Sequence, residues 1–202
     1  MDVYVSGVGM TKFGKSNNPL NRMMANAATS ALQDAQLESM DAIYIGMTRA
    51  DESIGDSNFT TLFSETPGLA CTPSPRIEIP SSTGIGAFET AFYAVASGHV
   101  KNALVLAGEK MTDFPGKATR ILSEASGRFE RRYGATLPAL AAMIAQKYAQ
   151  EFHLSPLKLQ DILAQVAIKN HSNGLLNSYA QFKDILTKED YLKSQIVSYP
   201  LR

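Results

Sequence analysis

Apolar and polar positions follow two kinds of pattern in the first half of the chain. Short runs have the composition of β-strands, while the apolar residues of longer segments recur every three or four positions, as on one helix face. The expected strands are 2–10, 42–47, 76–79 and 103–107. The expected helices are 20–35, a short one at 57–63, and 85–95, which Gly98 ends. This alternation predicts an α/β fold with helices on both sides of a layered sheet.

The pattern changes after Gly108, where no further strand is predicted. Residues 112–134 are polar and are expected to form an exposed loop region. Residues 138–152 and a segment that begins at Ser155 have helical spacing, and Thr187 to Asp190 have the spacing of a capping box. We therefore expect an α/β core over residues 1–111 and a mostly helical part over residues 112–202.

Composition and charge narrow the classes of partner. The chain has 202 residues, of which 45% are hydrophobic and 19% are charged, so it can bury a substantial core. Acidic and basic residues both number 19, which predicts neither a nucleic-acid partner nor a membrane surface. The chain starts in a strand pattern rather than a leader, which favours the cytoplasm. Its one cysteine, Cys71, excludes an internal disulfide.

The most informative stretch lies at residues 77–87. A β-type run breaks at Pro80 into a turn of small residues, and a helix follows. The first turn residue, Ser81, is thereby expected at the helix N-terminus. Unpaired backbone N–H groups and the helix dipole favour negative charge there, so such a corner suits a nucleophile.

This corner resembles the corresponding one in the thiolase family, and further stretches resemble the family in the same order. They are residues 5–14, 108–113, 169–171 and 177–182. The likeness is to the branch that includes the thiolase domain of sterol carrier proteins and the archaeal and bacterial acetyl-CoA acetyltransferases. It covers essentially the whole chain and implies the N-terminal half of such an enzyme, with a helical loop domain inserted before its last strand. In the family, that strand and a C-terminal half with the catalytic His and a second Cys come later.

The nucleophile position departs from the family. There the corner reads roughly Cys-Ala-(Ser/Thr)-Gly and the Cys carries the acyl group, whereas the matching residues here are Ser81, Ser82, Thr83 and Gly84. A hydroxyl is barely ionised near neutrality and needs an adjacent base, while a thiol needs only a modest pKa shift. We expect Ser81 to be a solvated or helix-capping residue, with a substitute nucleophile as the alternative. Ser82 is the expected N-cap.

The resemblance also implies an acyl-CoA pocket. The backbone near Gly84 would help to hold the thioester oxygen, and the loop-domain wall would be formed by His171, Asn177, Tyr179 and Phe182. His171 has a second interpretation, because it ends the helix predicted from Ser155, where an imidazole suits the dipole.

A cluster of arginines follows residue 127, and it comprises Arg128, Arg131 and Arg132. The cluster is either a solvated face or a contact for coenzyme A phosphates. No metal or dinucleotide signature is present. We expect no covalently bound cofactor and a coenzyme A thioester as substrate or ligand.

The resemblance implies a thiolase-like acyl-CoA acyltransferase of lipid metabolism, of the acetyl-CoA acetyltransferase type. We expect it to be inactive alone, because Ser81 replaces the Cys and the C-terminal half is missing. Two alternatives stay open: a subunit of a split thiolase, and a non-catalytic acyl-CoA-binding or assembly module. A third fold-level relative, the thiolase-like aldolases of side-chain degradation, shares the opening of the chain and its closing Pro-Leu-Arg but matches residues 108–113 less well.

An open sheet edge is the last expectation, because the final strand of the half is missing. The helix at 85–95 is also apolar enough to need covering on more than one side. Together they predict a homodimer, or a complex with a partner that carries the C-terminal thiolase half, joined near residues 76–79 and Ser81.

Overall fold

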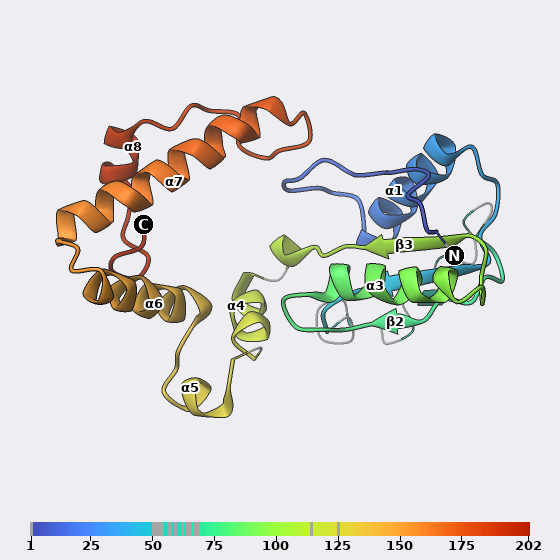
Figure 1. Cartoon of the computed structure of the whole chain (residues 1–202), viewed down its shortest axis with the longest axis horizontal. Coiled ribbons are helices and arrows are strands. Elements are labelled where there is room, and N and C mark those ends of the chain that lie inside the picture. Colours follow the sequence, from blue (N-terminus) through green and yellow to red (C-terminus); the bar gives the residue numbers. More distant parts are fainter. Residues whose placement is uncertain are drawn as a thin grey trace. The chain divides into compact units, whose positions relative to one another are not determined.

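The computed structural model describes residues 2–49, 55, 58, 60–61, 63, 66, 69–113, 115–124 and 126–202. The chain forms two compact units (Figure 1). Unit 1 comprises Met1–Thr11 and Lys15–Ala118, and unit 2 comprises Lys12–Gly14 and Thr119–Arg202. The short helix predicted at 57–63 lies largely outside the described residues.

Unit 1 is built on a parallel sheet with the strand order β2-β1-β3. The strands are β1 (Ala42–Gly46), β2 (Arg76–Ile77) and β3 (Ala103–Ala107). β1 pairs with β3 along its whole length and with β2 at its carboxyl end. Every residue of β1 is buried, as expected of a central strand with both faces covered. The strand predicted at 76–79 is shorter than expected, since pairing with β1 stops at Ile77.

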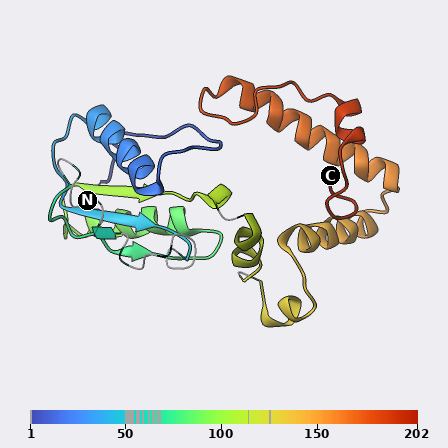
Figure 2. The ribbon, with the colours of Figure 1, turned by 180° about the vertical axis from the view of Figure 1, so that it is seen from behind.

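Helices α1 (Leu20–Ala35) and α3 (Thr83–Ala96) cover opposite faces of this sheet (Figure 1 and Figure 2). Alternate residues of β1 point to the two faces. Ile43 and Ile45 pack on the α1 side with Met24, Ala28 and Leu32, among others. Ala42 and Tyr44 pack on the α3 side with Ala87 and Ala91. The predicted α/β layering is thereby confirmed.

The buried face of α3 is lined by small residues: Thr83, Gly86, Ala87 and Ala91. A Cβ atom at Gly86 would lie 2.4 Å from Cδ1 of Ile79, so a larger residue there would require the Ile79 side chain to move. The large apolar residues that share the predicted face stay exposed instead, with Ile85 at 65%, Phe88 at 44% and Phe92 at 42%. α3 therefore presents an apolar surface that the described part of the chain does not cover.

Residues 2–10 do not form the predicted strand. They lie against α1, so closely that a Cβ atom at Gly9 would be 2.1 Å from the carbonyl oxygen of Ala27. The edge of β3 away from β1 has no strand beside it among the described residues. A cavity of about 570 Å³ lies between residues 3–9 and β3, and α1 and α3 also line it. A strand forms only where a neighbouring strand exchanges hydrogen bonds with it. Between residues 3–9 and the free edge of β3 there is a cavity instead, so residues 2–10 have no such neighbour there.

Beyond β3 the described chain is helical rather than the predicted loop over 112–134. A 3₁₀ turn (Met111–Asp113), α4 (Pro115–Ser123) and α5 (Arg128–Arg132) occupy this region. These short helices keep most of their polar side chains in solvent and bury little beyond Ile121. Their sequence is therefore as polar as that of an exposed loop, which is why a loop was predicted.

Three further helices complete unit 2: α6 (Leu137–Glu151), α7 (Pro156–Leu176) and α8 (Lys188–Lys193). Ser155 caps α7 by accepting a hydrogen bond from the N–H of Lys158, as predicted. The capping box of α8 is also confirmed, because Thr187 and Asp190 each accept the other's N–H at 3.1 Å.

Candidate functional site

The corner between β2 and α3 places Ser81 in a tight turn. The N–H of Ser82 donates to the carbonyl oxygen of Ile79 at 2.8 Å, which closes the turn. Ser81 has φ 62°, in the left-handed region that residues with a Cβ atom rarely occupy. Strained strand-to-helix turns of this kind expose nucleophiles in other folds. The Ser81 side chain is exposed and makes no hydrogen bond within the described part of the chain.

Ser82 occupies the N-cap position, but its side chain makes no capping hydrogen bond. Its φ of −133° and ψ of 16° depart from the extended geometry of most N-caps. The next residue instead ties the helix start back to the turn, since the hydroxyl of Thr83 donates to the carbonyl oxygen of Ile79 at 2.8 Å. Gly84 follows in the first turn of α3, where a Cβ atom would meet Ala107 at 3.6 Å. The corner is thus closed by Thr83 rather than by the predicted cap.

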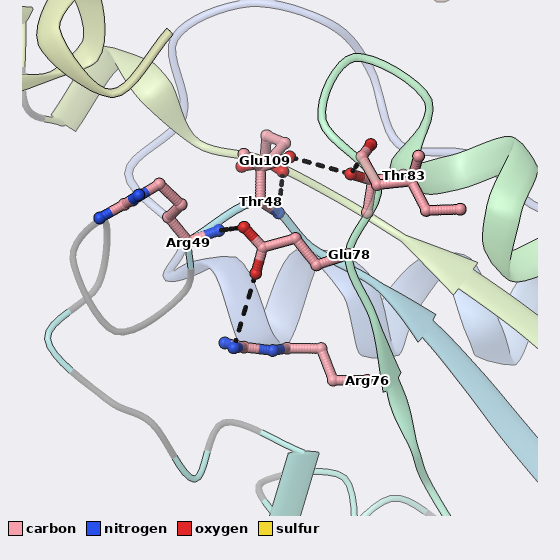
Figure 3. A network of polar contacts seen from close by, with 7 residues as sticks. Thr48, Arg49, Arg76, Glu78, Thr83 and Glu109 are labelled. Atoms are coloured by element: carbon pink, nitrogen blue, oxygen red, sulfur yellow. Dashed lines mark hydrogen bonds and ion pairs between the residues drawn. The ribbon is translucent and has the colours of Figure 1, made fainter. Parts of the chain in front are cut away.

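Polar residues that follow the three strands meet beside this corner (Figure 3). The N–H of Thr48, just after β1, donates to Oε1 of Glu109 at 2.7 Å. The hydroxyl oxygens of Thr48 and Thr83 lie 3.1 Å apart. The carboxyl ends of β1 and β3 are therefore linked to the first turn of α3.

A second carboxylate flanks the same strand end. The N–H of Arg49 donates to Oε1 of Glu78 at 3.0 Å, and the Arg76 guanidinium lies 3.6 Å from the other Glu78 oxygen (Figure 3). Desolvation raises the pKa of Glu109 above its ordinary value, and the like charge of Glu78 raises it further. Hydrogen bonds from Thr48 oppose this shift without cancelling it.

Sequence reasoning did not single out Thr48, Glu78 or Glu109 as site residues. The available signal was the position of two of them, because Thr48 and Glu109 follow predicted strands by one and two residues. Glu78 was expected inside the strand 76–79, and it follows β2 only because that strand ends at Ile77. Carboxyl ends of parallel strands meet at one edge of a sheet, which is where α/β proteins bind ligands. The order of the strands was needed to see that these three residues adjoin the Ser81 corner.

His171 lies inside α7, so the prediction that it ends the helix is wrong. The helix continues to Leu176. A single glycine inside a helix, here Gly174, lowers the stability of the helix but does not interrupt its hydrogen-bonded turns. The imidazole of His171 stacks on Phe182, with ring centroids 5.5 Å apart and an interplanar angle of 28°.

Asn177 is the C-cap of α7 and holds the loop that follows. Its side-chain oxygen accepts the N–H of Tyr179 at 3.0 Å, and its backbone carbonyl accepts a hydrogen bond from Lys183. The carbonyl oxygen of Tyr179 accepts the N–H of Phe13 at 2.9 Å. Unit 2 thereby brings Lys12–Gly14 together with the stretch 177–182, which is distant in sequence.

The candidate residues fall into two groups. Ser81 and Gly84 belong to unit 1, while His171, Asn177, Tyr179 and Phe182 belong to unit 2. The arginine cluster also lies in unit 2, where Arg120, Arg128, Arg131 and Arg132 line a hollow of about 450 Å³. Arg120 pairs with Glu124 at 3.2 Å.

The described residues include no group of His, Cys, Asp and Glu side chains that could hold a metal ion. Among the described helices, none has both the length and the apolar character needed to cross a membrane.

Sequence comparison matches residues 3–198 to a family model described as "Thiolase, N-terminal domain". The acetyl-CoA acetyltransferases of Methanothermobacter thermautotrophicus and Methanocaldococcus jannaschii are 33% and 34% identical to the chain over 204 residues. Both alignments cover 100% of the chain but only 52% and 51% of those proteins. Sterol carrier protein 2 of Gallus gallus is 27% identical over 213 residues, which cover 96% of the chain and 37% of that protein. The chain spans about half the length of the acetyltransferases it matches.

Solved structures share the fold at lower identity. The Ltp2-ChsH2(DUF35) aldolase matches with a TM-score of 0.68 and 21% identity, over 97% of this chain and 50% of that one. An acetyl-CoA acetyltransferase from Syntrophomonas wolfei matches with a TM-score of 0.61 and 17% identity, over 85% and 46%. The α/β architecture expected from the sequence is the architecture of these structures.

Proposed function

Because the chain belongs to the thiolase family, whose N-terminal domain it matches over residues 3–198, we propose that it is the N-terminal half of an acyl-CoA acyltransferase of the acetyl-CoA acetyltransferase type. The observation that supports this proposal most is the corner at Ser81. A strand, a turn in the left-handed region and a helix N-terminus follow one another there, which is the frame for a nucleophile.

The chain alone does not complete the family reaction. Ser81 offers a hydroxyl, which needs a general base within hydrogen-bond reach. No described residue makes a hydrogen bond to its side chain. A thiol at the same place would need only the helix N-terminus to lower its pKa. The backbone corner that would present the nucleophile is therefore retained, but the thiol that would carry the acyl group is replaced by the hydroxyl of Ser81.

Release of free coenzyme A tests this directly. Purified chain is incubated with acetyl-CoA and, separately, with acetoacetyl-CoA, and the free thiol is followed against a buffer blank and a Ser81→Ala variant. The expected rate equals the blank for both proteins. Release above the blank that disappears in Ser81→Ala would show that Ser81 is a working nucleophile and would overturn the proposal of inactivity.

We propose further that another polypeptide segment completes unit 1. The cavity of about 570 Å³ borders the free edge of β3, whose N–H and C=O groups have no strand partner among the described residues. Exposed Phe88 and Phe92 of α3 line the same cavity. Apolar walls beside a free strand edge suit an added β-strand. The C-terminal half of a thiolase, on this polypeptide or on a partner, is the proposed source, and a homodimer is the alternative.

A coenzyme A thioester is the ligand we propose for the loop after α7. The stacked pair His171–Phe182 and the loop held by Asn177 offer an aromatic surface with polar groups at its rim. Binding without turnover is what a non-catalytic acyl-CoA-binding module would show. The hydroxyl at Ser81 favours this second candidate function. If activity appeared when a C-terminal thiolase half was added, that result would favour a split enzyme instead.

A further inference from the structure

A second cavity of about 570 Å³ lies at the amino ends of the strands of unit 1. Its walls come from three segments: the start of β1 with Asp41 before it, Pro73 and Pro75 ahead of β2, and residues 99–100 after α3. The Ser81 corner follows β2, and the carboxyl ends of parallel strands lie at the opposite edge of the sheet. This cavity is therefore separate from the corner.

Tyr44 supplies a buried polar group to this cavity. It is only 7% exposed, and its ring packs with Ala87 and Ala91 of α3. Its hydroxyl makes no hydrogen bond within the described part of the chain. The hydroxyl is also not among the fully enclosed atoms of the described residues that lack a partner, so it opens into the cavity that Tyr44 lines. A buried tyrosine hydroxyl usually has a hydrogen-bond partner, and a ligand in the cavity would supply one here.

Asp41 lies at the exposed end of the same cavity. One of its carboxylate oxygens accepts the N–H of Asn102 at 2.8 Å and the N–H of Lys101 at 2.9 Å. These two hydrogen bonds lower the pKa of Asp41, so its carboxylate is charged at neutral pH. The other oxygen has no partner within the described part of the chain. Lys101 itself lines the cavity beside β3 and not this one, so a fixed negative charge with a free acceptor atom remains at this end.

The walls between these two polar groups are apolar and held in place. The carbonyl oxygen of Pro73 accepts the N–H of Ile43 at 2.9 Å. That of Pro75 accepts the N–H of Ile45 at 3.0 Å, so both prolines are fixed beside β1. Two proline rings together with the ring of Tyr44 favour a flat aromatic body between them.

The positions of the two polar groups set the length of a ligand that contacts both. Asp41 precedes Tyr44 by three residues, and an extended chain rises about 3.3 Å per residue, so the two lie about 10 Å apart along β1. His99 lines the same cavity, and its imidazole makes no hydrogen bond within the described residues. A neutral imidazole can accept a second N–H of the ligand. The complementary ligand is therefore elongated, with N–H donors and a positive charge at one end and a polar group at the other.

We propose that this cavity is a second ligand site of the chain, for a small organic cation with an aromatic body and a hydroxyl group at its far end. Asp41 binds the cationic end, and the hydroxyl of Tyr44 bonds the hydroxyl of the ligand. The site does not depend on the proposed function, because its residues precede the strands and its test involves no acyl transfer. Either proposal can fail without the other.

The test compares three probes on the intact chain by nuclear magnetic resonance, following the backbone amides of Tyr44, Lys101 and Asn102. The probes are para-hydroxybenzamidine, benzamidine, which lacks the hydroxyl, and para-hydroxybenzoate, which has the opposite charge. Both amidines should shift these amides at millimolar concentration, and para-hydroxybenzamidine should bind about threefold to tenfold more tightly, as expected of one added hydrogen bond. The benzoate should not bind.

Matched variants assign the contacts. Tyr44→Phe keeps the ring and should erase the preference for para-hydroxybenzamidine. Tyr93→Phe, on the exposed side of α3 with its hydroxyl bonded to Glu89, should leave that preference unchanged. Asp41→Asn should weaken both amidines about tenfold, because the hydrogen bond to a charged acceptor is lost.

The wild-type chain alone can overturn the proposal, so the outcome does not depend on how well a variant folds. Absence of amide shifts with para-hydroxybenzamidine would overturn it, and so would benzoate binding as tight as that of the amidines. An undiminished preference for the hydroxylated probe in folded Tyr44→Phe would also contradict the assigned contact.

Discussion

At the scale of single residues, Ser81 combines two properties that rarely occur together. It sits in a left-handed conformation, which costs a residue with a Cβ atom roughly 1–2 kcal/mol, and it presents a hydroxyl that nothing in the described chain activates. A residue chosen for stability alone would be glycine. The strain is understandable if the turn serves to expose a side chain at the N-terminus of α3.

Substitution by glycine tests the strain. Ser81→Gly should raise the free energy of unfolding by about 0.5–1 kcal/mol, because relief of the left-handed strain exceeds the entropy that glycine gains in the unfolded chain. Ser82→Gly is the matched control, since φ is −133° there and nothing is relieved. It should lower the free energy of unfolding by about 0.5 kcal/mol. Urea denaturation measures both, and equal changes in the two variants would show that Ser81 is not strained.

The sequence identified Ser81 but not its surroundings. A strand pattern, Pro80 and small residues are local signals, and they locate the corner without any knowledge of the sheet. Thr48, Glu78 and Glu109 are separated by long stretches of chain and adjoin only because the strands have the order β2-β1-β3. Single-sequence patterns carry no information on that order, so the network escaped prediction.

At the scale of elements, patterns succeeded where the described chain supplies the neighbour that an element packs or pairs with, and failed where it does not. The helix predicted at 20–35 and the strand predicted at 103–107 agree with α1 and β3. Residues 2–10 have strand composition and yet form no strand, because the position beside them is hollow.

The helix α3 shows the same limit. Its apolar residues predicted a helix that needs covering on more than one side, and the sheet covers only the side of Gly86, Ala87 and Ala91. Apolar spacing shows which residues avoid water and not which neighbour covers them. The predicted loop over 112–134 failed for a different reason, since α4 and α5 are short helices that bury little and therefore lack a clear apolar period.

At the scale of the whole molecule, our proposal that the chain associates rests on the free edge of β3, the adjoining cavity and the exposed face of α3 among the described residues. Contiguous apolar surface of this kind usually marks an interface. We expect dimers or larger species at micromolar concentration that dissociate over a tenfold dilution, measured by light scattering. Phe88→Glu on α3 should weaken association, whereas Phe129→Glu on α5, a residue that is 70% exposed, should not. A stable monomer at every concentration would contradict this expectation.

The central claim is that the Ser81 corner is a thiolase nucleophile site that lacks only its thiol. Its most direct test is the transfer of an acetyl group from acetyl-CoA to a Ser81→Cys chain, in which Cys71 is also changed to Ser. Intact mass and peptide mapping follow the reaction, and the wild-type chain reports the reactivity of the exposed Cys71. The account predicts one acetyl group on residue 81, gained faster than on Cys71, because the N-terminus of α3 stabilises the thiolate. An acetylation rate no higher than that of Cys71 would contradict the account.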